Sequence, residues 1–339
     1  MVLVMGAGKM GIAIAYDLMK QGMETRICDI RHANLPNFFV LDARDEEKVK
    51  EEMKKEEIVI SALPYDFNYR LAKLAIKTKT NFIDLGGNTE IVEKELKLHD
   101  EAKKAGITII PDCGLAPGMT NIVAGYLWKE GEKEIHIRVG GLPINPKPPL
   151  NYALFFSIHG LINEYIEDAI IVKNGKICKV ESLTGLEKIE FEGFGELEAF
   201  YTHGGTSTLP KTLEVKELDY KTIRYKGHAE KIYFLKSLGF FEKESREFTE
   251  KILEKALPKN EKDVVLARIY GKELEIELID YHDEKFSAMQ RTTGFPTAVI
   301  AKFIIDGEIK EGAYPPELAI DEEKFFKEIE KRGIKWQVK

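Results

Sequence analysis

The first eleven residues constrain the fold more than any other segment. An apolar run, Val2–Met5, leads directly into Gly6-Ala7-Gly8-Lys9-Met10-Gly11, and a helical pattern follows. In a strand–turn–helix setting, Gly6 permits a tight turn, Gly8 lets the backbone approach a pyrophosphate, and Gly11 lets helix and strand pack closely. The segment therefore predicts a dinucleotide-binding βαβ unit whose turn residues, from Gly6 to Gly11, contact the cofactor.

An acidic residue at the end of the second expected strand strengthens this prediction. Asp29 follows Gly11 by 18 residues, with Ile30 beside it, at the position where a carboxylate binds the ribose hydroxyls of the adenosine. A carboxylate there favours NAD, because it repels the 2′-phosphate of NADP. Arg31, two residues on, leaves some NADP use open.

Two further strand ends are expected to lie at the same edge of the sheet. Asp42 ends the third strand, where it either reaches the adenine amino group or is simply solvated. Ala62, Leu63 and Pro64 end the fourth strand, where the nicotinamide side of the cofactor should pass.

The first 120 residues alternate short apolar runs with amphipathic stretches, which is typical of a parallel sheet. The expected strands are 2–5, 25–29, 38–41, 58–62, 81–85 and 107–111, and the expected helices are 9–21, 46–55, 67–77 and 90–104. We therefore expect an α/β protein with a Rossmann domain over residues 1–125.

After about residue 126 the pattern changes to one of antiparallel strands. Asn174-Gly175 is a hairpin signal between strands 170–173 and 177–180, and strands 264–270 and 274–281 flank Gly271. Pro143–Pro149 should be a stiff loop, since proline does not fit a central strand. We therefore expect residues 126–290 to form a mixed α/β substrate domain, and the C-terminal helices within 291–339 should pack back on the first domain.

Composition excludes several classes of function. A chain of 339 residues suggests two domains, and a net charge of −7 without a basic tract argues against a nucleic-acid partner. Three scattered cysteines and dispersed histidines predict neither disulfides nor a metal site, which favours the cytoplasm. No run reaches the roughly 20 apolar residues of a membrane span. Abundant Lys and Glu with few Gln are typical of heat-adapted proteins.

A second glycine-containing turn follows the sixth strand. Asp112–Asn121 should lie at the carboxyl edge, with Cys113 and Leu115 near the nicotinamide. This segment resembles the corresponding turn of the saccharopine dehydrogenase family, in the shorter branch that includes lysine 6-dehydrogenase. Other segments that carry the resemblance are Val139–Pro143, Lys147–Pro149, Thr222–His228 and Met289–Phe295.

Two departures from the family pattern bear on the branch. Saccharopine reductases usually read LDPG where this chain has Leu115-Ala116-Pro117-Gly118, and they are about a hundred residues longer, so both differences favour the lysine branch. The resemblance implies a homodimer formed through the sheet of the second domain, so that residues 126–290 would be the substrate and dimerisation domain. It also implies oxidation of L-lysine by NAD at the ε-carbon to 2-aminoadipate 6-semialdehyde, ammonia and NADH, and the aldehyde would cyclise.

Such a reaction needs a carboxylate anchor and a base. Arg224 is the expected anchor, because a guanidinium suits a bidentate carboxylate contact; the alternative is a structural ion pair. For the base, His228, His159, His203 and Asp112 remain open, and His203 also belongs to a polar loop that could close over the substrate. Arg291 and Thr292 could add polar contacts to the substrate.

Three functions are consistent with the sequence. The first is lysine 6-dehydrogenase, and the second is a saccharopine-type dehydrogenase acting on a secondary amine of an amino acid. The third is an NAD-binding regulator without catalysis, against which the polar residues Asp112, Arg224 and His228 argue mildly.

Overall fold

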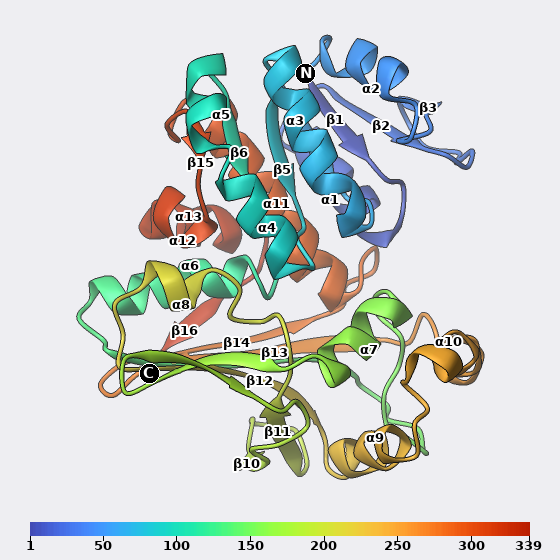
Figure 1. Ribbon diagram of the computed structural model, residues 1–339, viewed down its shortest axis with the longest axis vertical. Helices are drawn as coiled ribbons and strands as arrows, with labels where there is room; N and C mark the ends of the chain where they lie inside the picture. Colours follow the sequence, from blue (N-terminus) through green and yellow to red (C-terminus); the bar gives the residue numbers. More distant parts are fainter. The chain divides into compact units, whose positions relative to one another are not determined.

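The computed structural model describes all 339 residues, which form two compact units (Figure 1). Unit 1 consists of Met1–Ile122 and Gln290–Ile334, and unit 2 consists of Val123–Met289 and Lys335–Lys339. The sequence-based borders lay at about residues 125 and 290. None of the helices combines the length and apolar character needed to cross a membrane.

Unit 1 is built on a seven-stranded sheet in which every pairing is parallel. Its strand order is β15-β6-β5-β4-β1-β2-β3. The strands are β1 (Val2–Met5), β2 (Thr25–Asp29), β3 (Phe38–Val40), β4 (Ile58–Ser61), β5 (Asn81–Asp84), β6 (Thr108–Ile110) and β15 (Gly312–Ala313). The expected Rossmann-type architecture is confirmed.

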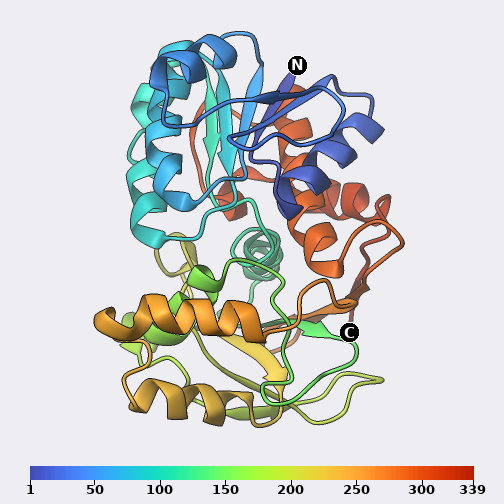
Figure 2. The ribbon, with the colours of Figure 1, turned by 90° about the vertical axis from the view of Figure 1, so that its right-hand side faces the viewer.

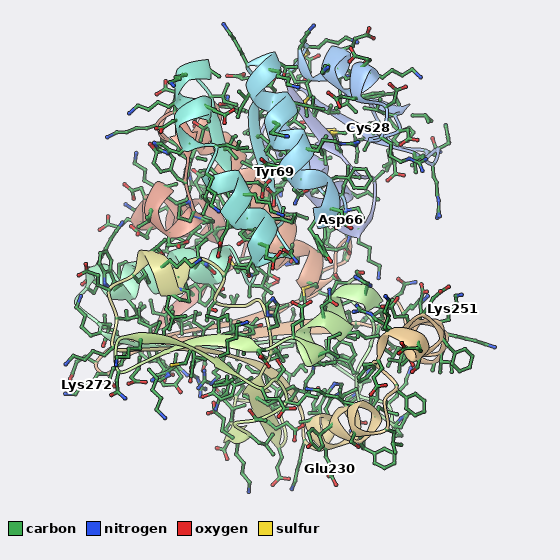
Figure 3. All side chains as sticks on the ribbon, in the orientation of Figure 1. Cys28, Asp66, Tyr69, Glu230, Lys251 and Lys272 are labelled. Atoms are coloured by element: carbon green, nitrogen blue, oxygen red, sulfur yellow. The ribbon has the colours of Figure 1, made fainter.

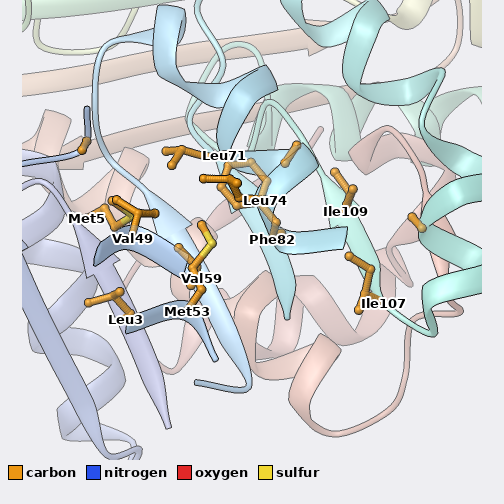
Figure 4. Close-up of a cluster of buried hydrophobic side chains, with 14 of the residues drawn as sticks. Leu3, Met5, Val49, Met53, Val59, Leu71, Leu74, Phe82, Ile107 and Ile109 are labelled. Carbon is orange, nitrogen blue, oxygen red and sulfur yellow. The ribbon is translucent and has the colours of Figure 1, made fainter. Parts of the chain in front are cut away.

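Helices cover both faces of this sheet, as Figure 2 shows. On one face, α2 (Glu46–Met53), α3 (Asn68–Thr78) and α5 (His99–Ala105) enclose the apolar cluster drawn in Figure 4, which includes Leu3 and Phe82. On the other face lies α1 (Lys9–Lys20) with α11 (Ala288–Ile305). Gly294 of α11 lies so close to α1 that a Cβ there would be 2.9 Å from that of Ala13.

The structure corrects two helix predictions in unit 1. The helix expected over 90–104 is two helices, α4 (Thr89–Leu96) and α5, because the chain turns at Lys97–Leu98 and so buries Leu98 in the core. The C-terminal helices were expected within 291–339, but the first of them begins earlier, at Ala288, and includes Pro296. The remaining helical segments are η1 (Tyr65–Phe67), α6 (Met119–Lys129), α12 (Pro316–Ala319) and α13 (Glu322–Glu330).

Unit 2 contains a nine-stranded mixed sheet, in which β12 and β7 are parallel and the other neighbours are antiparallel. Its strands are β7 (Glu134–Pro143), β8 (Ala169–Lys173), β9 (Lys176–Val180), β10 (Glu187–Ile189), β11 (Leu197–Tyr201), β12 (Glu217–Tyr225), β13 (Asp263–Tyr270), β14 (Glu275–Tyr281) and β16 (Trp336–Val338). The hairpin predicted at Asn174-Gly175 is confirmed: both residues have positive φ, as a tight turn of this kind requires.

Pro143 is an exception to the predicted loop, because it is the last residue of β7, a central strand between β12 and β13. The pairing of β7 with β12 ends at Val139 and Thr222, so Pro143 faces only β13, through Asp263. On the β12 side its missing N–H therefore costs no ladder hydrogen bond.

Four helices accompany this sheet: α7 (Ile158–Ile166), α8 (Leu209–Thr212), α9 (His228–Ser237) and α10 (Lys243–Ala256). A cluster of buried residues that includes Ile162, Phe200 and Ile232 joins α7 and α9 to the sheet. Figure 3 labels Glu230 of α9 and Lys251 of α10, whose exposed side chains mark the outer faces of these helices.

Candidate active site

The glycine turn of unit 1 has the geometry that a dinucleotide needs. Gly6 has φ +106° and lies so close to β4 that a Cβ would be 2.6 Å from the carbonyl oxygen of Ala62. A Cβ on Gly11 would be 1.8 Å from the carbonyl oxygen of Gly6, whereas a Cβ on Gly8 would have no neighbour within 4 Å. Gly6 and Gly11 are thus required for close contact, and Gly8 leaves open space beside the first turn of α1.

Asp29 is fixed beside this turn by two backbone donors. Its Oδ2 accepts the N–H of Ala7 at 2.9 Å, and its Oδ1 accepts the N–H of Arg31 at 3.0 Å. Each oxygen keeps a second lone pair for a hydroxyl, and Ile30 next to it is exposed. The open side of Gly8, the free N–H groups at the start of α1 and this carboxylate therefore fit the pyrophosphate and ribose of a dinucleotide.

The other predicted cofactor residues differ in how far they are already engaged. The carboxylate of Asp42 accepts hydrogen bonds from Nε and Nη2 of Arg44, and these bonds lower the pKa of Asp42 to about 2. Ala62 donates its N–H to Met5 and leads through Leu63 to Pro64, which precedes η1. This segment thus leaves the sheet next to the glycine turn.

The turn after β6 folds tightly upon itself. Asp112 has φ +59°, and the N–H of Cys113 donates to the carbonyl of Asp84 at 2.8 Å. The hydroxyl of Thr297 donates to the carbonyl of Cys113, and Met119 closes the turn by donating to Gly114. Cys113 is fully buried and packs within the turn, and burial raises the pKa of its thiol well above the usual value, which disfavours the reactive thiolate. Leu115 is buried with it.

Asp84 and Glu95 are two buried carboxyl groups beside this turn that sequence reasoning missed. Asp84 Oδ1 accepts the N–H of Gly86 at 2.6 Å and that of Asp112 at 3.5 Å. Gly86 adjoins the side chain of Asp112, since a Cβ on it would be 1.6 Å from Oδ1 of that residue. Asp84 ends β5 at the carboxyl edge, so the rule that selected Asp112 also points to it.

In unit 2, Arg224 is held by aromatic residues and one long ion pair. Its Nε donates to the hydroxyl of Tyr165 at 3.3 Å, and its Cζ lies 4.7 Å from the centre of the Tyr152 ring. Its Nη2 is 3.6 Å from Oε2 of Glu164, which is too long for a hydrogen bond. Burial raises the pKa of Glu164 to about 7, although the charge of Arg224 opposes this shift.

His228 shares this cluster, and its two ring nitrogens are both occupied. Nδ1 lies 2.9 Å from the carbonyl oxygen of Leu150 and must therefore carry the hydrogen, while Nε2 accepts from Tyr165 at 3.0 Å. Burial, and then the charge of Arg224, lower the pKa of His228 to about 3. His228 is thus a neutral residue that connects through Tyr165 to Arg224.

The remaining candidate residues lie in other surroundings. His159 is exposed on α7 and contacts Glu250 and Arg246 of α10. His203 contacts the carbonyl of Asp168 and the carboxylate of Glu167. In unit 1, Arg291 donates to the carbonyl of Arg332, and Thr292 is fully buried. The structure therefore brings together only Arg224 and His228 of the candidates in unit 2. No three His, Cys, Asp or Glu residues are arranged to hold a metal ion.

Comparison with protein-family models covers nearly the whole chain. Residues 2–110 match the saccharopine dehydrogenase NADP binding domain, and residues 114–334 match the saccharopine dehydrogenase C-terminal domain. The chain belongs to the saccharopine dehydrogenase family. The resemblance read from the sequence is confirmed at this level, and a nicotinamide dinucleotide is the cofactor type that the family model supports.

Curated relatives include two saccharopine dehydrogenases [NADP(+), L-glutamate-forming]. That of Saccharomyces cerevisiae is 30% identical over 225 residues, covering 62% of this chain and 50% of the relative. That of Pyricularia oryzae is 27% identical over 248 residues, covering 66% and 54%. The chain thus spans about half the length of these relatives. A solved structure of apo saccharopine dehydrogenase (L-Glu forming) from S. cerevisiae has a TM-score of 0.79 at 22% identity, covering 100% of this chain and 99% of that one, which shows a shared fold.

Two alanine substitutions should separate cofactor binding from folding. Gly8→Ala places its methyl group in open space, so the melting temperature should change by less than about 3 °C, while dinucleotide affinity should fall at least about tenfold. Gly11→Ala would place its methyl group 1.8 Å from the carbonyl oxygen of Gly6, so it should lower both the melting temperature and the dinucleotide affinity. Thermal melts and NADH or NADPH fluorescence titrations measure the two effects. A Gly8→Ala protein that binds dinucleotide normally would contradict the cofactor position.

Proposed function

We propose that this protein is a dehydrogenase that oxidises the ε-carbon of L-lysine with NAD, giving 2-aminoadipate 6-semialdehyde, ammonia and NADH. Family membership supports a dehydrogenase acting on a carbon–nitrogen bond of an amino acid. The turn at Gly6–Gly11 and Asp29 supports a dinucleotide cofactor. The choice of lysine depends on the residues of unit 2.

The chemistry defines what the residues must do. The ε-ammonium loses a proton, a hydride leaves the ε-carbon for the nicotinamide, and water adds to the resulting iminium so that an aldehyde and ammonium form. The protein must therefore accept a proton from an amine whose pKa is about 10.4 in water, and it must hold the α-carboxylate away from the reacting carbon.

The observation that carries the proposal is the charge inventory of unit 2. Its buried cations are Arg138, Lys221 and Arg224. Arg138 hydrogen-bonds Asp219 at 2.6 Å and also Glu187, and Lys221 lies 2.5 Å from Glu187. Arg224 alone contacts its carboxylate partner beyond hydrogen-bond distance. One cation able to receive a new carboxylate suits a substrate with a single carboxylate, such as lysine.

For the base we favour Asp112 over the three histidines. His228 donates to Leu150 and accepts from Tyr165, and its low pKa leaves it a poor proton acceptor. His159 and His203 are each paired with acidic residues of unit 2. Asp112 lies at the carboxyl edge of the unit 1 sheet, the edge at which a dinucleotide binds in this fold.

A second candidate is a saccharopine-type dehydrogenase, which oxidises a secondary amine joining an amino acid to a keto-acid skeleton. The names of the relatives favour it, since they include saccharopine dehydrogenases and alpha-aminoadipic semialdehyde synthases. Its substrate carries more carboxylates than lysine and so requires further cationic anchors.

The substrate assignment is tested by following NADH formation with lysine, saccharopine and ornithine. Lysine should be oxidised, its product should react with o-aminobenzaldehyde, and turnover should rise toward alkaline pH as the amine loses its proton. With lysine labelled at the ε-position, deuterium should appear in NADH and ¹⁵N in ammonia. Oxidation of saccharopine without oxidation of lysine would replace the first candidate by the second.

Arg224→Ala should lower kcat/KM for lysine by the factor that corresponds to a loss of about 2–5 kcal/mol of transition-state binding. This is the cost of removing one partner of a buried charge contact. Dinucleotide affinity should stay unchanged, because the cofactor residues lie in unit 1. Tyr165→Phe is the matched control: it removes the hydrogen bond to Arg224 but keeps the guanidinium, so its effect should be much smaller. A protein that unfolds on loss of Arg224 would assign this residue to structure.

Preference for NAD over NADP is expected from Asp29. Asp29→Ala should weaken NAD binding and remove repulsion of the 2′-phosphate, so the ratio of kcat/KM values should shift toward NADP. Asp42→Ala should shift it less, because Arg44 already holds that carboxylate. A wild-type protein that prefers NADP, as the relatives' names state for them, would overturn this assignment. The expected homodimer, cytoplasmic location and heat-adapted origin stay predictions.

A further inference from the structure

Glu95 is a buried carboxyl group whose oxygens have no donor. It lies on α4, and its side chain is fully buried. Neither Oε1 nor Oε2 accepts a hydrogen bond from an N–H or O–H of the protein, and Asp84 Oδ2 has none either. An ionised carboxylate without a donor is among the most costly groups to bury.

The neighbours of Glu95 make the ionised form still less favourable. They are acidic or neutral: Asp84 ends β5, Asp112 and Cys113 follow β6, and Asn68 of α3 lies beside Asp84. The charged groups that act on Glu95 are Asp84 and Asp112, and both are acidic. Burial, and next the negative charge of Asp84, raise the pKa of Glu95.

One proton satisfies both groups. If Glu95 is a neutral carboxylic acid, its O–H can donate to Asp84, whose Oδ1 already accepts from Gly86 and Asp112. We propose that Glu95 and Asp84 share one buried proton and that this carboxyl pair is a positioning device for the Asp112 turn.

The pair connects three segments at one edge of the sheet. Through Asp84 it links α4 to the Gly86 turn after β5 and to the Asp112 turn after β6 (Figure 1). Gly86 in turn contacts the side chain of Asp112. Loss of the proton would place a second negative charge here and weaken the arrangement that holds Asp112 at its positive φ. A role for this device in turnover rests on the proposed function of Asp112, whereas the shared proton does not.

The shared proton has a definite pH signature. A folded-state pKa above the unfolded value means that the unfolded chain releases this proton first, so the group's stabilising contribution is complete below the unfolded pKa and decreases as pH rises toward the folded pKa. Glu95→Gln keeps the shape and an N–H donor toward Asp84 but cannot titrate. The melting temperature of Glu95→Gln minus that of the wild type should therefore increase steadily from pH 5 to pH 9.

The experiment combines three variants with four measurements: melting temperature, infrared absorption, kcat and dinucleotide affinity. Melting temperatures across this pH range compare wild type with Glu95→Gln and with Glu90→Gln, an exposed glutamate of the same helix that should show no such trend. Infrared spectra at pH 9, where Glu164 with its pKa of about 7 is ionised, should show a protonated-carboxyl carbonyl band that Glu95→Gln removes and Glu90→Gln keeps. Glu95→Leu, which lacks the donor, should lower kcat at least tenfold with unchanged dinucleotide affinity. Glu95→Gln, which keeps a donor, should have a kcat close to that of the wild type.

The outcomes separate the shared proton from the proposed function. A difference in melting temperature that does not depend on pH, or a carbonyl band at pH 9 that survives in Glu95→Gln, would overturn the shared proton. If the melting-temperature trend and the carboxyl band are as expected but kcat is unchanged in Glu95→Leu, the positioning role would be overturned while the shared proton stands. Failure of lysine oxidation in the wild type would affect only the proposed function, because the melting and infrared measurements need no substrate.

Discussion

Close approach of backbone to backbone at the start of unit 1 is the constraint on which its cofactor site depends. Gly11 leaves no room for even a methyl group beside the carbonyl of Gly6, and a Cβ on Gly6 would be 2.6 Å from the carbonyl oxygen of Ala62, directly after β4. Because β1, α1 and β4 meet this closely, Asp29 can receive the N–H of Ala7 from across the turn. The carboxylate is thereby oriented before any ligand binds, which lowers the entropic cost of binding.

Buried charge is handled differently in the two units. In unit 2, Arg224 lies over the Tyr152 ring and receives only a distant carboxylate, so its charge is incompletely compensated. In unit 1, the charges that act on Glu95 are those of Asp84 and Asp112, so backbone N–H groups and a proton compensate the buried pair. Both arrangements are unfavourable for stability alone, which is typical of residues retained for function.

The sequence was most informative where the geometry of the backbone itself requires particular residues at particular spacings. The glycine turn, Asp29 and the Asn174-Gly175 hairpin followed from spacing and turn chemistry. The break at Lys97–Leu98 did not, because burial of Leu98 decides it and no proline or glycine marks it. Pro143 could not be placed, since its tolerance depends on where the neighbouring strand stops pairing.

The candidate site was harder to predict than the fold for the same reason. Arg224 and His228 are close in sequence, but Tyr165, which joins them, comes from α7. Nothing in the sequence around β12 indicates that this tyrosine lies beside it. Asp84 lay within reach of the strand-end rule. Glu95 could not be predicted, because a single glutamate on a helix is usually solvated. Only its buried position against β5 shows that this one is not.

The path of the chain has a consequence for synthesis. Unit 1 completes its sheet by pairing β15 with β6, and so joins Gly312 to Thr108, while β16 adds to unit 2 from the last residues. On the ribosome, the sheet of unit 1 therefore cannot be completed until residues 312–313 have emerged, and that of unit 2 not until residues 336–338 have emerged. The edge of β6 must stay unpaired while about two hundred residues are added, so a chain stalled in between would leave both units open to aggregation.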